Sequence, residues 1–280
     1  MSFISGGAQF GQPSRGAGLL FGLRVDAICM AEALERCRQA LETRRTLLVG
    51  VLNAAKIVSL QKNGELRNAI LDCNMLLADG QAVVWASRVL GHKLPERVAG
   101  IDLFQELLGL ADRDHRRIYL LGATPHVLDS LLVEISRRWP GAEIVGSQDG
   151  YYTEDQAEAV AERIRNARPD MLFLGMPSPK KEIFLRRFQD HLGVPILHGV
   201  GGSFDVLAGL TRRAPVLWQR MGLEWAYRLL QEPRRLWKRY LTTNTAFVTL
   251  TLREVFRPSA ELQRMPTSDR TGPSGQPLSP

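Results

Sequence analysis

The segment DMLFLGMPSPKKEIFLRRFQDH, residues 170–191, contains the pattern that decides the fold. A short apolar run ends at Gly175, a loop with two prolines follows, and amphipathic sequence begins at Lys180. The apolar run has the length of a strand and the later part has the length of a helix. The segment therefore predicts a buried strand that leads through a short loop into a helix.

The same pattern recurs along the chain. Apolar runs that predict strands occupy 46–53, 117–122, 142–146, 170–175 and 195–201. Segments that predict helices lie within 127–139, 155–167 and 180–191. Short strands that alternate with helices of about 10–15 residues indicate βαβ units and a parallel sheet covered on both faces. We therefore predict an α/β, Rossmann-like fold with a mostly parallel sheet.

The composition is that of a globular protein. Its 280 residues are enough for one large or two small domains. The sequence is 45% hydrophobic and 23% charged, which is ordinary for a soluble protein with a sizeable core. The three cysteines form no C-x-x-C pair, which argues against a disulfide framework or a zinc site. We find no signal peptide and no apolar run long enough to span a membrane. Residues 1–18 and 258–280 are rich in small and polar residues, and we expect both to be disordered.

The positive charge is concentrated near the C-terminus. Residues 211–257 contain ten Lys or Arg and three Glu, so their net charge of +7 equals that of the whole chain. Tryptophan and arginine on an amphipathic helix suit a membrane interface with anionic lipids. We therefore predict a basic amphipathic, membrane-docking helical appendage over 211–257, after an α/β domain over 19–210. Simple packing of this segment on the core is the alternative, and we see no fold that recognises nucleic acid.

Several predicted strand ends are suited to bind an anion. In parallel sheets, ligands bind beyond the carboxyl ends of the strands. Glycines there, such as Gly122, Gly201 and Gly202, let backbone N–H groups approach a phosphate. Lys180 and Lys181 lie in the first turn of a predicted helix, where cations are unfavourable unless an anionic ligand is bound. A solvated helix end and a glycine turn needed only for packing are the alternatives.

Asp79 ends the apolar run Met75–Ala78 and precedes a second apolar run. It is expected to cap a helix that begins near residue 81, to hold a carboxylate at a cleft, or to do both. The pair Asp112 and Asp114 could hold a divalent ion, but it precedes a strand and is expected at the amino edge of the sheet, away from a ligand. No histidine spacing suits a metal, so we predict neither a metal site nor a cofactor.

Blocks of sequence along the chain, taken in order, carry a resemblance to a known family. They lie between about residues 23 and 240 and are VLNAAKIV with Asn53, the ADG of Asp79, RVAGIDL with Arg97 and Asp102, GMPSPKKE, GVGGSFDVLAG, Arg213-Ala214-Pro215 and GLEWAYRLLQEPRR. Together they resemble the WecG/TagA/CpsF family of bacterial glycosyltransferases. The resemblance implies an inverting, metal-independent transfer of a sugar from a UDP-sugar to a sugar on a polyprenyl diphosphate. It also implies a peripheral enzyme of exopolysaccharide biosynthesis at the cytoplasmic face of the inner membrane.

The resemblance further implies roles for individual residues. Asp79 matches the proposed general base, and Asn53 is placed with it in the catalytic set. The residues expected to contact the substrates are Arg97, Asp102, Gly122, Lys180, Lys181, Glu182, Gly201, Gly202, Asp205, Arg213, Arg228, Arg234 and Arg235. The last three would come from the appendage. Without a metal, the departing diphosphate needs fixed amides and cations of this kind.

Two positions depart from the family pattern: Val51 stands where many members have Thr, and Lys181 where many have Gln. The Lys-Lys form, together with LNAAKIV, resembles the branch that includes the xanthan enzyme GumM, which implies glucose as the transferred sugar and a glucosyl lipid as the acceptor. Transfer of N-acetylmannosamine or its uronic acid to lipid-linked N-acetylglucosamine is the alternative. A non-catalytic, UDP-binding membrane assembly factor and a Rossmann oxidoreductase are rivals, and the latter lacks the G-x-G-x-x-G fingerprint.

Overall fold

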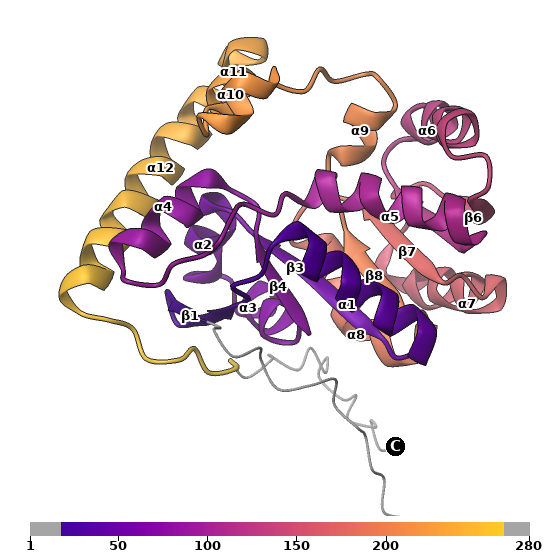
Figure 1. Cartoon of the computed structure of the whole chain (residues 1–280), viewed down its shortest axis with the longest axis horizontal. Coiled ribbons are helices and arrows are strands. Elements are labelled where there is room, and N and C mark those ends of the chain that lie inside the picture. The colour runs from indigo at the N-terminus through magenta and orange to yellow at the C-terminus, as the bar shows by residue number, and fades with distance from the viewer. Residues whose placement is uncertain (1–17, 266–280) are drawn as a thin grey trace, which may run out of the picture.

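A parallel β-sheet forms the centre of the computed structural model, which describes residues 18–265 (Figure 1). Within these residues the central sheet has six strands in the order β4-β3-β8-β7-β5-β6, and each neighbouring pair is parallel. The strands are β3 (Leu47–Leu52), β4 (Met75–Ala78), β5 (Arg117–Gly122), β6 (Glu143–Gln148), β7 (Met171–Gly175) and β8 (Ile196–Gly199). The predicted α/β, Rossmann-like fold with a mostly parallel sheet is confirmed.

The sequence does not predict two of the strand regions. β4 is the four-residue apolar run before Asp79, and the helix α4 (Gln81–Val89) follows it after two residues. β1 (Gly18–Leu20) and β2 (Leu23–Val25) form an antiparallel hairpin. Just after this hairpin, the N–H of Asp26 donates to the carbonyl of Leu76 in β4 at 2.9 Å. Strands of three or four residues are too short to show a clear period in the sequence.

Helices cover both faces of the sheet, as predicted. On one face lie α1 (Met30–Thr43), α5 (Gly100–Asp114), α6 (Pro125–Arg138) and the short α9 (Ser203–Leu207). On the other lie α2 (Ala54–Leu60), α3 (Gly64–Leu71), α4, α7 (Ala157–Ala167), which follows the 3-10 turn Glu154–Gln156, and α8 (Lys180–Leu192). Successive residues of β3 alternate between the two cores: Val49 and Val51 pack with α5, whereas Leu48 packs with α8.

The C-terminal segment is helical and packs on the body. Its helices are α10 (Val216–Arg220), α11 (Glu224–Gln231) and α12 (Pro233–Phe256). α12 lies along α2, and its Phe247 is buried against Phe21, with ring centroids 5.5 Å apart (Figure 1). α11 packs on α12 through Trp225 and Tyr240, whose ring centroids are 5.8 Å apart. No helix in residues 18–265 is both long and apolar enough to cross a membrane.

Residues 258–265 return to the body, which corrects the expectation that the chain is disordered from residue 258 onward. The N–H of Leu262 donates to the carbonyl of Gly22 at 2.7 Å, and Glu261 forms an ion pair with Arg24. The side chain of Asn68 exchanges two hydrogen bonds with the backbone of Met265, at 2.7 and 2.8 Å. Composition could not predict these contacts because the partners lie about 200 residues away in sequence. The other residues expected to be disordered, 1–17 and 266–280, lie outside the described part of the chain.

Candidate active site

The carboxyl ends of the strands meet at one edge of the sheet, and most of the predicted site residues lie along it. From β4 toward β6, the segments at this edge are Asp79 and Gly80, Asn53, Gly199–Gly202, Gly175–Pro179, Gly122–Pro125 and Gly150. The strand order therefore places the Asp79 carboxylate at one end of a row of glycine-containing loops. This is the edge at which α/β proteins bind their ligands.

Asp79 does not cap the helix that follows it, contrary to one of the two predicted roles. The N-cap of α4 is Gly80, and no side chain caps this helix. Instead, Oδ1 of Asp79 accepts a hydrogen bond of 2.9 Å from the N–H of Gly100, the first residue of α5. The N–H of Asp79 donates to the carbonyl of Leu52 at 2.8 Å. Two elements thus fix the carboxylate: the sheet holds its backbone, and the positive end of α5 holds its oxygen.

Asn53 lies beside the Asp79 loop at the end of β3. Its Oδ1 accepts a 2.9 Å hydrogen bond from the N–H of Lys56 and so caps α2. Its Cβ would lie 3.4 Å from a Cβ added to Gly80, so the two loops are in contact. The structure accounts for Asn53 as a helix cap, and its placement in the catalytic set remains a prediction.

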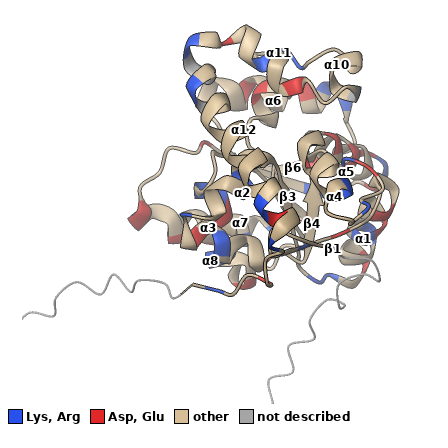
Figure 2. Cartoon of the chain, turned by 90° about the vertical axis from the view of Figure 1, so that its left-hand side faces the viewer, with Lys and Arg blue, Asp and Glu red and all other residues tan. Residues whose placement is uncertain are grey.

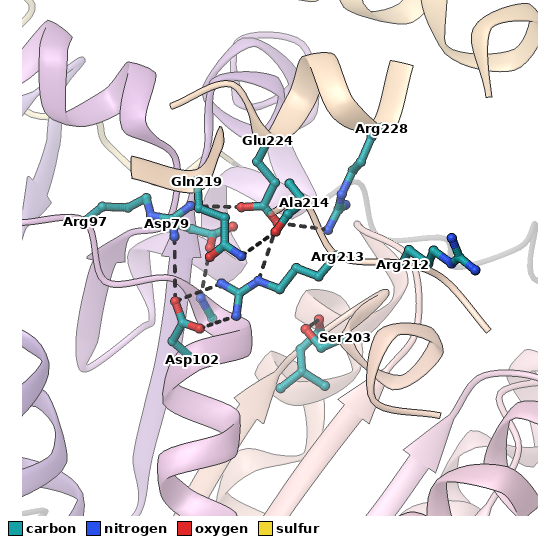
Figure 3. Close-up of polar contacts among 12 residues, drawn as sticks. Asp79, Arg97, Asp102, Ser203, Arg212, Arg213, Ala214, Gln219, Glu224 and Arg228 are labelled. Atoms are coloured by element: carbon teal, nitrogen blue, oxygen red, sulfur yellow. Dashed lines mark hydrogen bonds and ion pairs between the residues drawn. The ribbon is translucent and has the colours of Figure 1, made fainter. Parts of the chain in front are cut away.

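A cluster of opposite charges lies next to Asp79 (Figure 3). We call Arg97, Arg213 and Arg228 the arginine cluster, and their acidic partners are Asp102 and Glu224. Both terminal nitrogens of Arg213 donate to the Asp102 carboxylate, one of them at 3.0 Å. Arg97 donates to Glu224 at 3.0 Å and lies 3.7 Å from Asp102. The predicted site residues Arg97, Asp102, Arg213 and Arg228 are therefore brought together, from both the body and the appendage.

The acidic partners of Arg213 favour its charged form. Burial opposes the charged guanidinium, but the hydrogen bonds and charge of Asp102 and the charges of Glu224 and Asp79 together raise the pKa of Arg213. Glu224 is a site residue that sequence reasoning missed. In the sequence it is only an acid in the first turn of a predicted helix, where acids are common. Its partners become visible only in the folded chain.

The two lysines at the start of α8 have separate partners. The ammonium of Lys180 donates to the carbonyl of Gly150 at 2.7 Å and lies 4.0 Å from the centre of the Tyr152 ring. It therefore ties the loop after β6 to α8. Lys181 is buried and forms an ion pair of 2.9 Å with Glu182. These partners explain how two cations are accommodated at a helix N-terminus.

Glu182 is buried and paired with two lysines, and its predicted place among the substrate contacts remains a prediction. Both of its carboxylate oxygens are buried, and one lies 2.9 Å from the ammonium groups of both Lys181 and Lys56. Burial favours the neutral acid, but the two lysines outweigh it and lower the pKa of Glu182 to about 2. Lys56 also donates to the carbonyl of Val51 at 2.7 Å. The group therefore joins α2, α8 and the end of β3 beneath the site.

Two of the predicted glycines, Gly122 and Gly201, adopt a backbone conformation that favours glycine. Gly122 has a φ of +126°, and a Cβ there would lie 2.7 Å from the carbonyl carbon of Gly175. Gly201 has a φ of +56°. Gly202 precedes α9, a one-turn helix that the sequence does not predict, and Asp205 lies within it. The carbonyl of Asp205 accepts the N–H groups of residues 210 and 211, which turns the chain toward Arg213.

Of the appendage arginines predicted to contact the substrates, the structure places only some in the arginine cluster. Arg228 lies 3.7 Å from Glu224 and joins the cluster. Arg234 is exposed in the first turn of α12, and the side chain of Arg235 lies outside the described residues. Figure 3 also shows that Arg212 points away from the cluster, although it precedes Arg213 in sequence.

His198 is a second residue that the sequence analysis missed. It is fully buried in β8, and its Nε2 lies 3.1 Å from the carbonyl oxygen of Gly100, the residue whose N–H binds Asp79. Burial, aided by the charges of Lys56 and Lys181, lowers the pKa of His198 to about 4, although backbone carbonyls favour the protonated ring. The imidazole is therefore neutral at neutral pH and supports the α5 N-terminus from beneath.

The acidic pair at the other end of α5 lies where the sequence places it. Oδ1 of Asp112 accepts the N–H of Gly141 at 2.6 Å, before β6. Asp114 lies 3.9 Å from Arg116, just before β5 begins. Within residues 18–265, no group of three or more His, Cys, Asp or Glu is arranged to hold a metal ion.

A sequence model of a known family matches almost the whole described region. It represents the WecG/TagA/CpsF family of glycosyl transferases and covers residues 19–261. The chain belongs to this family. The match spans the central sheet, the charged residues at its edge and the C-terminal helices α10, α11 and α12.

One relative in this family allows a finer comparison. The N-acetylglucosaminyldiphosphoundecaprenol N-acetyl-beta-D-mannosaminyltransferase of Bacillus spizizenii is 39% identical over 181 residues, which are 65% of this chain and 69% of the relative. Its name specifies an N-acetylmannosaminyl group, so the comparison favours the alternative sugar and overturns the expectation of glucose. That expectation depended on the Lys180-Lys181 pair together with the LNAAKIV block, and in the structure Lys181 forms an ion pair with Glu182.

Proposed function

We propose that the chain transfers N-acetylmannosamine from a UDP-sugar to N-acetylglucosamine carried on a polyprenyl diphosphate. The family match makes the chain a glycosyltransferase, and the relative supports the choice of sugar and acceptor. One structural observation carries the proposed mechanism. The Asp79 carboxylate is held by the N–H of Gly100 at the ligand edge of the sheet, beside the arginine cluster.

In the proposed reaction, Asp79 is the general base. It removes the proton from an acceptor hydroxyl while that oxygen attacks the anomeric carbon from the face opposite UDP. The new glycosidic bond forms as the bond to the UDP oxygen breaks, and UDP leaves with the bonding electrons. For an α-linked nucleotide sugar this inversion gives a β product, which agrees with the configuration in the relative's name. A positioned base of this kind accelerates a reaction by roughly 10²–10⁴-fold.

The departing diphosphate requires positive charge, and we assign this role to protein groups. Arg97 and Arg213 are partly buried, so their charges are less screened by water than those of surface residues. The glycine loops add backbone N–H groups along the same edge. Guanidinium groups match phosphate oxygens in geometry and charge. This supports a metal-independent transfer, in which fixed donors stabilise the charge that develops on the leaving group.

We further propose that the appendage docks on an anionic membrane surface, at the cytoplasmic face where lipid-linked acceptors would be met. Its exposed apolar residues include Leu217, Leu230, Trp237 and Leu241. Basic residues lie among them where α11 meets α12 (Figure 2). Apolar side chains beside basic ones suit the boundary between acyl chains and anionic headgroups.

The test of this function is a donor screen against a defined acceptor. The purified chain is incubated with a short-chain N-acetylglucosaminyl diphospholipid and either UDP-N-acetylmannosamine or UDP-glucose, and UDP release and product mass are measured. We expect turnover with the first donor and little with the second. Equal or preferred use of UDP-glucose would disprove the assigned sugar, and UDP binding without any product would favour a non-catalytic assembly factor.

A further inference from the structure

The carboxylate of Glu224 is surrounded by the arginine cluster. It accepts a hydrogen bond from Arg97 at 3.0 Å, and its other oxygen lies 3.8 Å from Nε of Arg213 and 3.7 Å from Arg228. Figure 3 shows this carboxylate facing the guanidinium groups. The residue is partly buried, with 19% of its side chain exposed, so these contacts lie largely out of bulk water. Glu224 therefore occupies a position in which an anion is strongly favoured.

Two carboxylates neutralise part of the charge of the arginine cluster. Asp102 binds Arg213 through two hydrogen bonds, and Glu224 faces the remaining guanidinium surfaces. Nε of Arg213 is buried and has no hydrogen-bond partner among the described residues. A buried donor of this kind favours a ligand that reaches it more closely than Glu224 does at 3.8 Å. A phosphate oxygen has the charge and the acceptor capacity to do so.

Asp102 and Glu224 differ in how easily each carboxylate can move away from the arginine cluster. Asp102 lies in the first turn of α5, which the sheet and Asp79 hold in place. Glu224 belongs to α11, which packs on α10 through Trp218 and Tyr227 and on α12 through Trp225 and Tyr240, rather than on the central sheet. Glu224 can therefore withdraw without disturbing the strand ends that carry the catalytic candidates.

We propose that Glu224 is an internal anion that fills the phosphate position of the arginine cluster, and that a diphosphate ligand displaces it. This inference rests on the proposed function, because it assigns the diphosphate of a substrate to that cluster. Binding of the ligand and docking of the first turn of α11 then oppose each other. By linkage, the ligand weakens that docking by the same factor by which the docking weakens the ligand. The appendage thereby responds to occupancy of the site.

The first experiment measures binding of inorganic pyrophosphate to the full-length chain by calorimetry. Glu224→Gln keeps the shape of the side chain but removes the competing charge, so we expect it to tighten binding by about tenfold, within the usual range of site coupling. Glu106→Gln removes an equal charge from an exposed position on α5 and serves as the matched control, with unchanged affinity expected. Added salt at about 0.5 M should reduce the difference.

Unchanged or weaker pyrophosphate binding in Glu224→Gln would overturn the inference, as would the absence of binding to both proteins. A second measurement needs no variant. Hydrogen exchange of the α11 amides in the wild-type chain should accelerate when pyrophosphate is added, and equal or slower exchange would also overturn it. The donor screen tests the proposed function separately. Sugar transfer with an unchanged pyrophosphate affinity in Glu224→Gln would remove this inference alone. Tighter pyrophosphate binding in Glu224→Gln without sugar transfer would remove the proposed function alone.

Discussion

At the scale of single residues, the site depends on contacts that join distant positions. Asp79 was predictable as a carboxylate between two apolar runs, but its partner, Gly100, is 21 positions away. The sequence predicts a cap on α4 because Asp is a favoured residue just before a helix. The fold instead turns the carboxylate toward α5, whose first N–H groups have no partner within their own helix. Glu224 and His198 were missed because their roles exist only through such partners.

Substitution of Asp79 tests its role as the base. Asp79→Asn keeps an oxygen that can accept from the N–H of Gly100, so the fold should be retained, but the amide cannot accept the proton of the acceptor. We expect kcat to fall by roughly 10²–10⁴-fold with a nearly unchanged melting temperature. Asp79→Ala should lose as much activity and also about 1 kcal/mol of stability, because α5 loses its cap. Asp114→Asn, at the opposite edge of the sheet, is the control. Near-normal rates in both Asp79 variants would show that Asp79 only caps α5 and is not the base.

His198 gives the protein a defined dependence of stability on pH. Its pKa is about 4 in the folded protein and near 6.5 when unfolded, so between these values the unfolded chain binds a proton that the folded protein does not. The free energy of unfolding should therefore fall by about 3 kcal/mol as the pH drops from 6.5 to 4, with no further loss from this group below that. Urea unfolding at several pH values measures the effect. In His198→Gln this part of the pH dependence should vanish; identical pH profiles for the two proteins would contradict the assignment.

At the scale of elements, the alternation of strands and helices was readable because each type of element buries a face with its own period. The helices expected within 127–139, 155–167 and 180–191 are observed at 125–138, 157–167 and 180–192. The short elements β1, β2, β4 and α9 were not predicted, because a segment of three to five residues is too short to show a periodic pattern. For α12 the sequence indicates amphipathic character, but only the structure shows that Phe247 faces the body while Trp237 faces solvent.

The exposed face of α12 can be tested for membrane docking without disturbing the core. Trp237 and Leu241 are 49% and 61% exposed, so Trp237→Ser combined with Leu241→Ser should leave the melting temperature nearly unchanged. We expect the double variant to sediment several-fold less with anionic liposomes, because it loses apolar area that would enter the lipid. Val133→Ser, on the exposed face of α6, is the control. Undiminished liposome binding by the double variant would remove this surface from the docking proposal.

At the scale of the whole molecule, the strand order assembles the site. Because β3 lies between β4 and β8, the Asp79 loop, Asn53 and the glycine loop after β8 become neighbours at one edge. The appendage then folds back so that Glu224 meets Arg97, 127 positions earlier in the chain. Residues 258–265 attach the chain after α12 to the β1–β2 turn through a backbone hydrogen bond to Gly22, and to α3 through the side chain of Asn68. The basic C-terminal segment, which looks separate by charge, thus contributes residues to the candidate site.

The sequence by itself determined the α/β architecture, the basic C-terminal helices and the family, because periodicity, charge and ordered motifs are local properties of the chain. It could not determine that Glu182 is buried with two lysines, that Glu224 enters the arginine cluster, or that Asp79 caps α5. These depend on which distant backbone and side-chain groups are brought together once water is excluded. Buried charges and unpaired N–H groups are costly, so the fold pairs them with whatever partner the topology places within reach.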